Sequence, residues 1–168
     1  MEYVIYGDQK YQKFAEFLEE NIKKLVDKKY INFSLPMIYL QDLGVQTSSS
    51  YNPAMFIIRL NIADIEGIFS NSIPAFDRAF FTRVKRENFL DTPEKVLLFI
   101  CLHEIAHVEQ EYTGKVHATG SHNSCMWKGK LYHTNELGLI PGLNHTELPW
   151  EYDANMTAIA LYRVAMEK

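Results

Sequence analysis

The 168-residue sequence predicts an α+β fold with a buried helix at its centre. Apolar residues three or four apart between residues 9 and 29 indicate a helix, and alternation between residues 31 and 39 indicates a strand. An unbroken apolar run over residues 96–102 indicates a helix that is buried on every side. Because 47% of the residues are apolar, the chain has enough material for the core of one domain, which we expect to span residues 1–168.

The N-terminal helix is predicted to be amphipathic and to lie on the surface of the domain. Its apolar residues share one face, and Lys and Glu fill the positions between them. Asp8 precedes the helix and is a suitable N-cap, because its carboxylate can accept a backbone N–H. The apolar face consists of Tyr11, Phe14, Ala15, Leu18, Ile22, Leu25 and Val26.

Two strands and a second helix are expected before the central helix. Apolar residues at the odd positions of 31–39 predict the first strand, and Pro36 favours a sheet edge or a break there. Residues 54–60 predict the second strand, and residues 47–53 read as a polar loop between the two. We expect the strands to pair antiparallel in a short, mostly antiparallel sheet. The second helix is expected to begin near Pro74.

The central helix has clear signals at both ends. Thr92 is a suitable N-cap, Pro93 suits the first helical position, and Gly114 marks the end of the helix. The segment 115–148 is predicted to be ordered loop around a site, apart from a short strand-like stretch over residues 127–132. Residues 150–166 return to helical spacing and predict a C-terminal helix.

A metal-binding motif, His103-Glu104-Ile105-Ala106-His107, follows the apolar run of the central helix. Two imidazoles four residues apart on a helix point the same way, so they can bind one metal ion. The intervening Glu104 can then reach a water molecule on that ion. Polar groups on a buried helix are costly unless something binds them, and a divalent metal removes this cost.

A third metal ligand is expected downstream, because zinc in a hydrolytic site takes three protein ligands and keeps one position for water. Glu151 is the preferred candidate. It begins the C-terminal helix, where Ala154 and Ala158 permit a close approach to the central helix and Asn155 could hydrogen-bond a ligand histidine. The other candidates are His117, His122, His133 and His145.

The motif and the start of the C-terminal helix resemble a known group of enzymes. His103-Glu104-x-x-His107 followed by Glu151-x-x-Ala154-Asn155 resembles the gluzincin arrangement, and is similar to ImmA/IrrE-type metallopeptidases. The segment 127–132 followed by Pro149-Trp150-Glu151 also resembles small zincin-like proteins often encoded by phages. This resemblance implies a zincin-like fold and peptide hydrolysis, with Zn²⁺ on His103, His107 and Glu151 and with Glu104 as the catalytic acid and base.

A second resemblance keeps the same chemistry but changes the third ligand. His122, followed by Asn123, Trp127 and the segment 138–141, resembles SprT-like proteases, whose third ligand is a histidine. It implies a zinc protease with His122 in place of Glu151.

Charge and hydropathy limit the partners that we expect. The net charge is −4 and no run of Lys or Arg forms a basic arm, so we expect a peptide or protein substrate and no nucleic acid. The apolar run is too short to cross a membrane and the N-terminus does not read as a secretory signal, so we expect a cytoplasmic protein. Cys101 lies in the apolar run and is expected to be buried packing. The alternative function is a non-proteolytic, zinc-containing binding or scaffold protein, such as a host-factor binder or virion component.

Two further roles are assigned to groups of residues rather than to one. An edge strand upstream of the metal helix, with residues 54–60 as the candidate, would hold an extended peptide by main-chain pairing. A donor to the substrate oxygen that gains negative charge would come from His117, His133, His145, Tyr132 or Tyr152.

Overall fold

The computed structural model describes residues 4–44, 49–63, 65, 75–88, 90–117, 119, 123–135 and 138–167. In chain order its elements are β1 (Ile5–Gly7), the 3₁₀ turn η1 (Gln9–Tyr11), α1 (Gln12–Asp27), β2 (Met37–Gln41), β3 (Ser50–Asn52), β4 (Ile57–Asn61), α3 (Ala75–Asn88), α4 (Pro93–Tyr112), β5 (Val116–His117), β6 (Ser124–Trp127), β7 (Lys130–His133), the 3₁₀ turn η2 (His145–Glu147) and α5 (Pro149–Ala165). These elements confirm the predicted α+β class.

The main sheet has four strands in the order β1-β2-β4-β3. β1 and β2 are parallel, β2 and β4 are parallel, and β3 pairs antiparallel with β4. The prediction of a mostly antiparallel sheet is therefore wrong for this sheet. The segment predicted as a polar loop contains β3, and this extra strand reverses the chain so that β4 returns parallel to β2. The small sheet β5-β6-β7 is antiparallel throughout.

The helix α1 connects β1 to β2, since two parallel neighbours need a crossover connection between them. Its predicted apolar face is confirmed, because Leu18, Ile22 and Leu25 are fully buried. The predicted cap is wrong. Asp8 precedes the turn η1 rather than α1, and its side chain makes no capping hydrogen bond.

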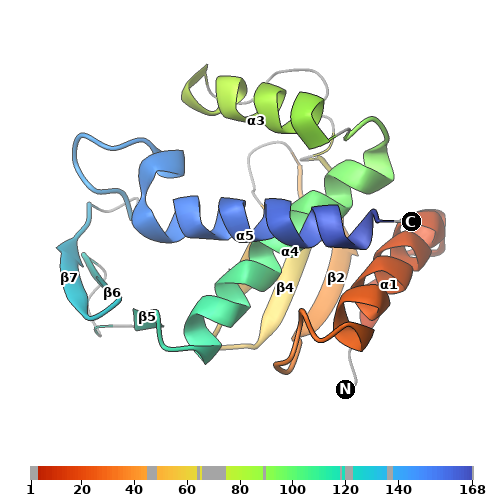
Figure 1. Cartoon of the computed structure of the whole chain (residues 1–168), viewed down its shortest axis with the longest axis horizontal. Helices are drawn as coiled ribbons and strands as arrows, with labels where there is room; N and C mark the ends of the chain where they lie inside the picture. The colour runs from red at the N-terminus through yellow and green to blue at the C-terminus, as the bar shows by residue number, and fades with distance from the viewer. Residues whose placement is uncertain are drawn as a thin grey trace.

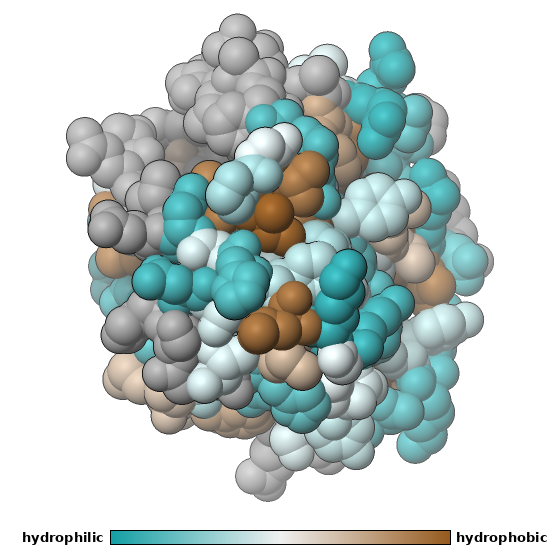
Figure 2. Space-filling model, turned by 90° about the vertical axis from the view of Figure 1, so that its left-hand side faces the viewer, coloured by the Kyte–Doolittle hydropathy of each residue, from teal (hydrophilic) through white to brown (hydrophobic). Residues whose placement is uncertain are grey.

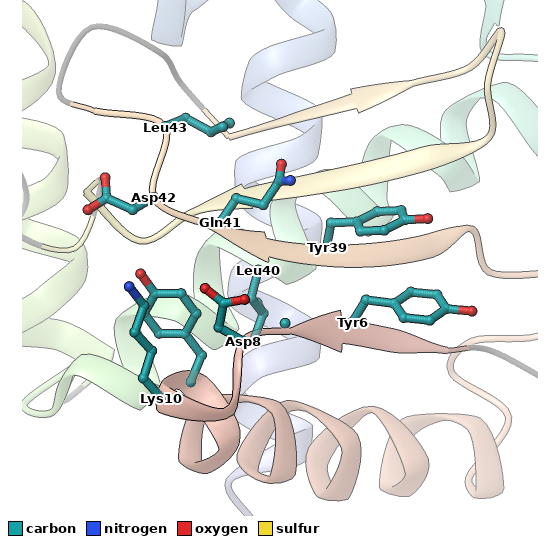
Figure 3. A pocket seen from close by; sticks show the side chains of 10 residues that line it. Tyr6, Asp8, Lys10, Tyr39, Leu40, Gln41, Asp42 and Leu43 are labelled. Atoms are coloured by element: carbon teal, nitrogen blue, oxygen red, sulfur yellow. The ribbon is translucent and has the colours of Figure 1, made fainter.

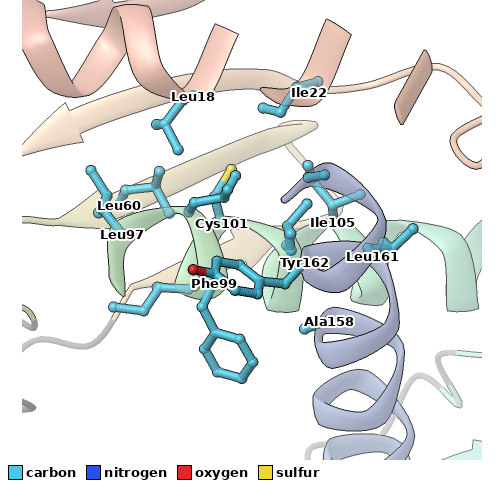
Figure 4. Packing of buried hydrophobic residues seen from close by; sticks show 14 of the residues in the cluster. Leu18, Ile22, Leu60, Leu97, Phe99, Cys101, Ile105, Ala158, Leu161 and Tyr162 are labelled. Atoms are coloured by element: carbon cyan, nitrogen blue, oxygen red, sulfur yellow. The ribbon is translucent and has the colours of Figure 1, made fainter. Parts of the chain in front are cut away.

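The helix α4 lies between the main sheet and α5, and α1 packs against it from the side (Figure 1). Its run from Val96 to Leu102 is buried in all directions, as predicted. Leu97 and Cys101 of α4 meet α1 and β4 on one side and α5 on the other (Figure 4). The predicted start is confirmed as well, because the Thr92 side chain accepts the Lys95 N–H at 3.2 Å and Pro93 occupies the first turn.

The helix α5 crosses α4 closely because its inner face carries small side chains (Figure 1). Ala154, Ala158 and Ala165 are fully buried, so the two backbones approach without large side chains between them. Glu151 lies in the first turn of α5 and points to the same inner side, since it is also buried. Within the part of the chain that the structure describes, no helix is long and apolar enough to cross a membrane.

Candidate metal centre

The structure brings His103, His107 and Glu151 together at the crossing of α4 and α5. His103 Nε2 lies 3.1 Å from Glu151 Oε2, and His107 Nε2 lies 3.0 Å from Glu151 Oε1. The two imidazole Nε2 atoms are 3.1 Å apart. One ligand atom from each of these three residues therefore lies within 4.8 Å of the others, and together they form a group that could hold a metal ion.

The spacing of these atoms fits a tetrahedral ion. With metal–nitrogen bonds of about 2.05 Å, neighbouring ligand atoms of a tetrahedral site lie about 3.3 Å apart. The two Nε2 atoms are 3.1 Å apart, and each lies 3.0 or 3.1 Å from one of the two Glu151 carboxylate oxygens, so these separations are close to this value. Two imidazole nitrogens and one carboxylate oxygen are also a donor set that zinc takes in hydrolytic sites.

Hydrogen bonds and charges between the histidines and Glu151 shift the pKa values of the cluster. Burial opposes the charged form of His107, but its hydrogen bond to Glu151 and the charge of that carboxylate outweigh burial and raise the pKa of His107 to about 9. Burial also acts to raise the pKa of Glu151, yet hydrogen bonds from His103 and His107 hold this pKa well below its ordinary range. A divalent cation that binds between these groups would take the place of the protons on the histidines.

Glu104 lies beside the triad and is 7% exposed. Burial raises the pKa of its carboxyl group, while the charges of His103 and His107 act to lower it. The backbone N–H of Tyr51 donates a hydrogen bond to this carboxyl group. Because Tyr51 belongs to β3, the acidic group between the two histidines is next to an edge strand of the main sheet.

Gln110 is a member of the site that the sequence analysis missed. Its Oε1 lies 2.9 Å from His107 Nδ1, and its amide group donates to the Trp150 carbonyl and to Asp153 Oδ2. We expected Asn155 in this role, but the contact of His107 is made by Gln110. The signal available in the sequence was a polar residue three positions after His107 on the same helix.

The remaining candidate ligands, all histidines, differ in how they lie relative to the cluster. His122 lies outside the described residues, so its candidacy stays a prediction. His117 and His133 are exposed on β5 and β7 and are not part of the cluster. His145, on η2, lies with Nε2 3.6 Å from Glu151 Oε2, and half of its side chain is exposed.

The surface around the β6–β7 hairpin is mainly hydrophilic, with small separate apolar groups (Figure 2). At this end of the described chain, Leu131 is 48% exposed and Tyr132 packs edge-on against Trp150, the residue before Glu151. A separate hollow at the ends of β1 and β2 is lined by Asp8, Lys10 and Gln41 beside the stacked rings of Tyr6 and Tyr39 (Figure 3). It shares no residue with the candidate metal centre.

Comparison of the chain with protein-family models, with curated proteins and with solved structures found no match. The functional argument therefore depends on the residues of the site.

Proposed function

We propose that this chain is a zinc-dependent metallopeptidase, in which His103, His107 and Glu151 bind the ion and Glu104 is the general base. The observation that carries the proposal is the convergence of the two imidazole Nε2 atoms and the Glu151 carboxylate, with contacts of 3.0 to 3.1 Å between them and a fourth, acidic side chain beside them. A site that only stabilises the fold has no use for Glu104.

The zinc ion, when bound, would acidify a water molecule and polarise the carbonyl of the scissile peptide bond. Glu104 takes the proton from that water and later delivers it to the leaving amine. The Tyr51 N–H supports this role because it fixes the carboxyl group of Glu104 in one orientation. The buried run Val96–Leu102 supports it too, because it packs the helix that carries Glu104 into the hydrophobic core.

An extended peptide is the expected substrate, with β3 as the strand that it pairs with. We expected residues 54–60 to supply this edge, but β4 is an interior strand, between β2 and β3. β3 lies at the edge of the main sheet, and its Tyr51 contacts Glu104. A peptide that adds to β3 by main-chain pairing would therefore pass beside the general base.

His145 is the described candidate best placed to assist the reaction. Of the five residues considered as donors to the substrate oxygen, it is the one that contacts the triad, at 3.6 Å from Glu151 Oε2. Asn144 and Glu147 fix its turn through a capping box, in which each side chain accepts the backbone N–H of the other residue.

The test is a pair of measurements on the whole chain: the zinc content per chain, and the cleavage of a mixed peptide library with and without a chelator. We expect one zinc per chain and cleavage that stops on chelation and returns with added zinc. Glu151→Gln should lower the zinc affinity by about 10²-fold or more, whereas the control His122→Ala should not. The opposite pattern would assign the third ligand to His122. Tight zinc binding without cleavage of any peptide would favour the scaffold alternative.

A further inference from the structure

Gln110 is a buried polar residue whose partners come from two different helices. It lies in the second half of α4, it is 2% exposed, and it has both a carbonyl oxygen and an amide group to satisfy. One end of the side chain faces His107 on α4, and the other end faces the first turn of α5.

The hydrogen-bond partners determine which way the amide points. The Trp150 carbonyl at 2.7 Å and the Asp153 carboxylate at 2.9 Å can only accept hydrogen bonds, so both must face the NH₂ group of Gln110. The carbonyl oxygen of Gln110 is then left facing His107 Nδ1 at 2.9 Å. A flipped amide would place an oxygen against two acceptors.

This orientation in turn determines which nitrogen of His107 carries the hydrogen. The Gln110 oxygen has no hydrogen to give, so His107 Nδ1 must be the donor. In the neutral imidazole the lone pair is then on Nε2, the atom that lies 3.1 Å from His103 Nε2 and 3.0 Å from Glu151 Oε1. The other tautomer of the ring would place an unprotonated Nδ1 against the Gln110 carbonyl oxygen, and two acceptors in contact inside the protein are unfavourable.

The same side chain also fixes the position of the third ligand. Trp150 and Asp153 flank Glu151 in the first turn of α5, and both accept hydrogen bonds from Gln110. Lys115 Nζ, 3.7 Å from Asp153 Oδ1, supports that turn from the end of α4. One amide therefore connects the helix of the two histidines to the helix of the glutamate.

We propose that Gln110 is the positioning residue of the metal centre: it selects the His107 form whose Nε2 binds metal, and it holds Glu151 in register with the two histidines. This inference rests on the proposed metal site. It predicts a loss of metal affinity rather than a specific loss of the chemical step, because Gln110 touches neither the ion nor the substrate.

The first experiment compares wild type with Gln110→Leu, which keeps the volume and removes the polar atoms. Zinc affinity is measured by competition with a chelator, and the imidazole nitrogens of His107 by ¹⁵N NMR of the zinc-loaded protein. We expect the affinity to fall about 10- to 100-fold and the slowly exchanging Nδ1–H signal of His107 to be lost. Unchanged affinity and an unchanged Nδ1–H signal would overturn the inference and leave the proposed function intact. A wild-type chain that binds no zinc would overturn both.

A matched control separates positioning from general loss of structure. Asn88 is a second buried amide that connects two helices, since it donates to the Val84 carbonyl at 3.0 Å and accepts from Arg163 Nε at 2.9 Å. We expect Asn88→Leu to lower stability and to keep the zinc affinity of the folded protein. An equal loss of affinity in Asn88→Leu and Gln110→Leu would overturn the specific role of Gln110.

A pair of substitutions that exchanges the amide and the carboxylate between positions 110 and 153 tests the same contact even where Gln110→Leu fails to fold. Gln110→Glu retains an acceptor for His107 but places a carboxylate against Asp153, so the zinc affinity should fall. Adding Asp153→Asn returns a donor to the contact, and we expect the double variant to recover about tenfold in affinity over Gln110→Glu. No recovery in the double variant would overturn the inference.

Discussion

The two halves of α4 differ in what surrounds them, although they form one continuous helix. From Val96 to Leu102 every side chain is at most 9% exposed and its surroundings are apolar. From His103 onward the helix still buries Ile105 and Val108, but it also buries polar side chains that contact groups from other parts of the site. Glu104 has the Tyr51 N–H of β3, and Gln110 has Trp150 and Asp153 of α5.

The difference indicates that the first half of α4 supports the fold, whereas the second half carries the residues of the proposed site. The first half needs only shape and hydrophobicity, so many apolar side chains would serve it. The polar side chains of the second half need specific hydrogen-bond partners at short distances, because an unpaired polar group inside a protein is costly. Substitutions in the first half should therefore change stability with little effect on the site, and substitutions in the second half should do the reverse.

The largest effect is expected for Glu104→Gln in the second half. The amide cannot take a proton from water, so turnover should fall about 10³-fold while the zinc content stays at the wild-type value. Initial rates of peptide cleavage and metal analysis of the purified protein measure the two quantities. Glu94→Gln, in the first turn of the same helix, is the control and should retain its rate. Full activity of Glu104→Gln would exclude Glu104 as the general base.

In the first half, Leu98→Ala should lower the free energy of unfolding by about 3 kcal/mol. Leu98 is fully buried, so the truncation removes apolar contacts and leaves a cavity in the core. Urea unfolding of the zinc-free protein measures the loss, and chelator competition measures the zinc affinity of the folded variant. A fall in zinc affinity comparable to that of Glu151→Gln would show that the halves are coupled and would contradict the comparison.

A smaller effect is expected for His145→Ala, which removes a neighbour of the triad rather than a ligand. If His145 donates to the substrate oxygen, the turnover number should fall on the order of 10²-fold with the zinc affinity retained. His133→Ala, at an exposed position of β7, is the control. Loss of zinc in His145→Ala would instead show that His145 is a fourth ligand.

The smallest effect concerns the reactivity of the two thiols. Burial raises the pKa of Cys101 far above its ordinary value and raises that of Cys125 as well, so each thiol stays protonated to a higher pH than a free cysteine. Cys101 is fully buried and Cys125 is only partly buried. At pH 8, iodoacetamide should therefore modify Cys125 slowly and leave Cys101 unmodified until urea unfolds the chain, as mass spectrometry can show. Modification of Cys101 in the folded protein would indicate that the first half of α4 opens.

The sequence predicted most about the parts of the molecule that have local signals. The start of α4 is confirmed because a cap, a proline and an apolar run act within a few neighbouring residues. The helix that carries Glu151 was predicted for the same reason, and the structure brings this residue to the two histidines.

The features that were missed depend on partners distant in the sequence. Three residues are too few to show strand periodicity, so β3 was read as loop and the direction of β2 against β4 was wrong as a consequence. The spacing of Gln110 from His107 was the one local signal for its role, because its partners Trp150 and Asp153 come forty or more positions later. Asn155 was chosen in its place because it is near Glu151 in the sequence.

The close crossing of α4 and α5 has a consequence for how this chain can vary in length. The proposed metal ligands belong to two helices that pack against each other at Ala154 and Ala158, while the chain between them leaves the crossing as the β5–β6–β7 sheet and returns through η2. Insertions or deletions between Thr134 and Leu143 would therefore leave the ligands in place. A change in the length of that segment would therefore alter the surroundings of the proposed metal centre without moving its ligands.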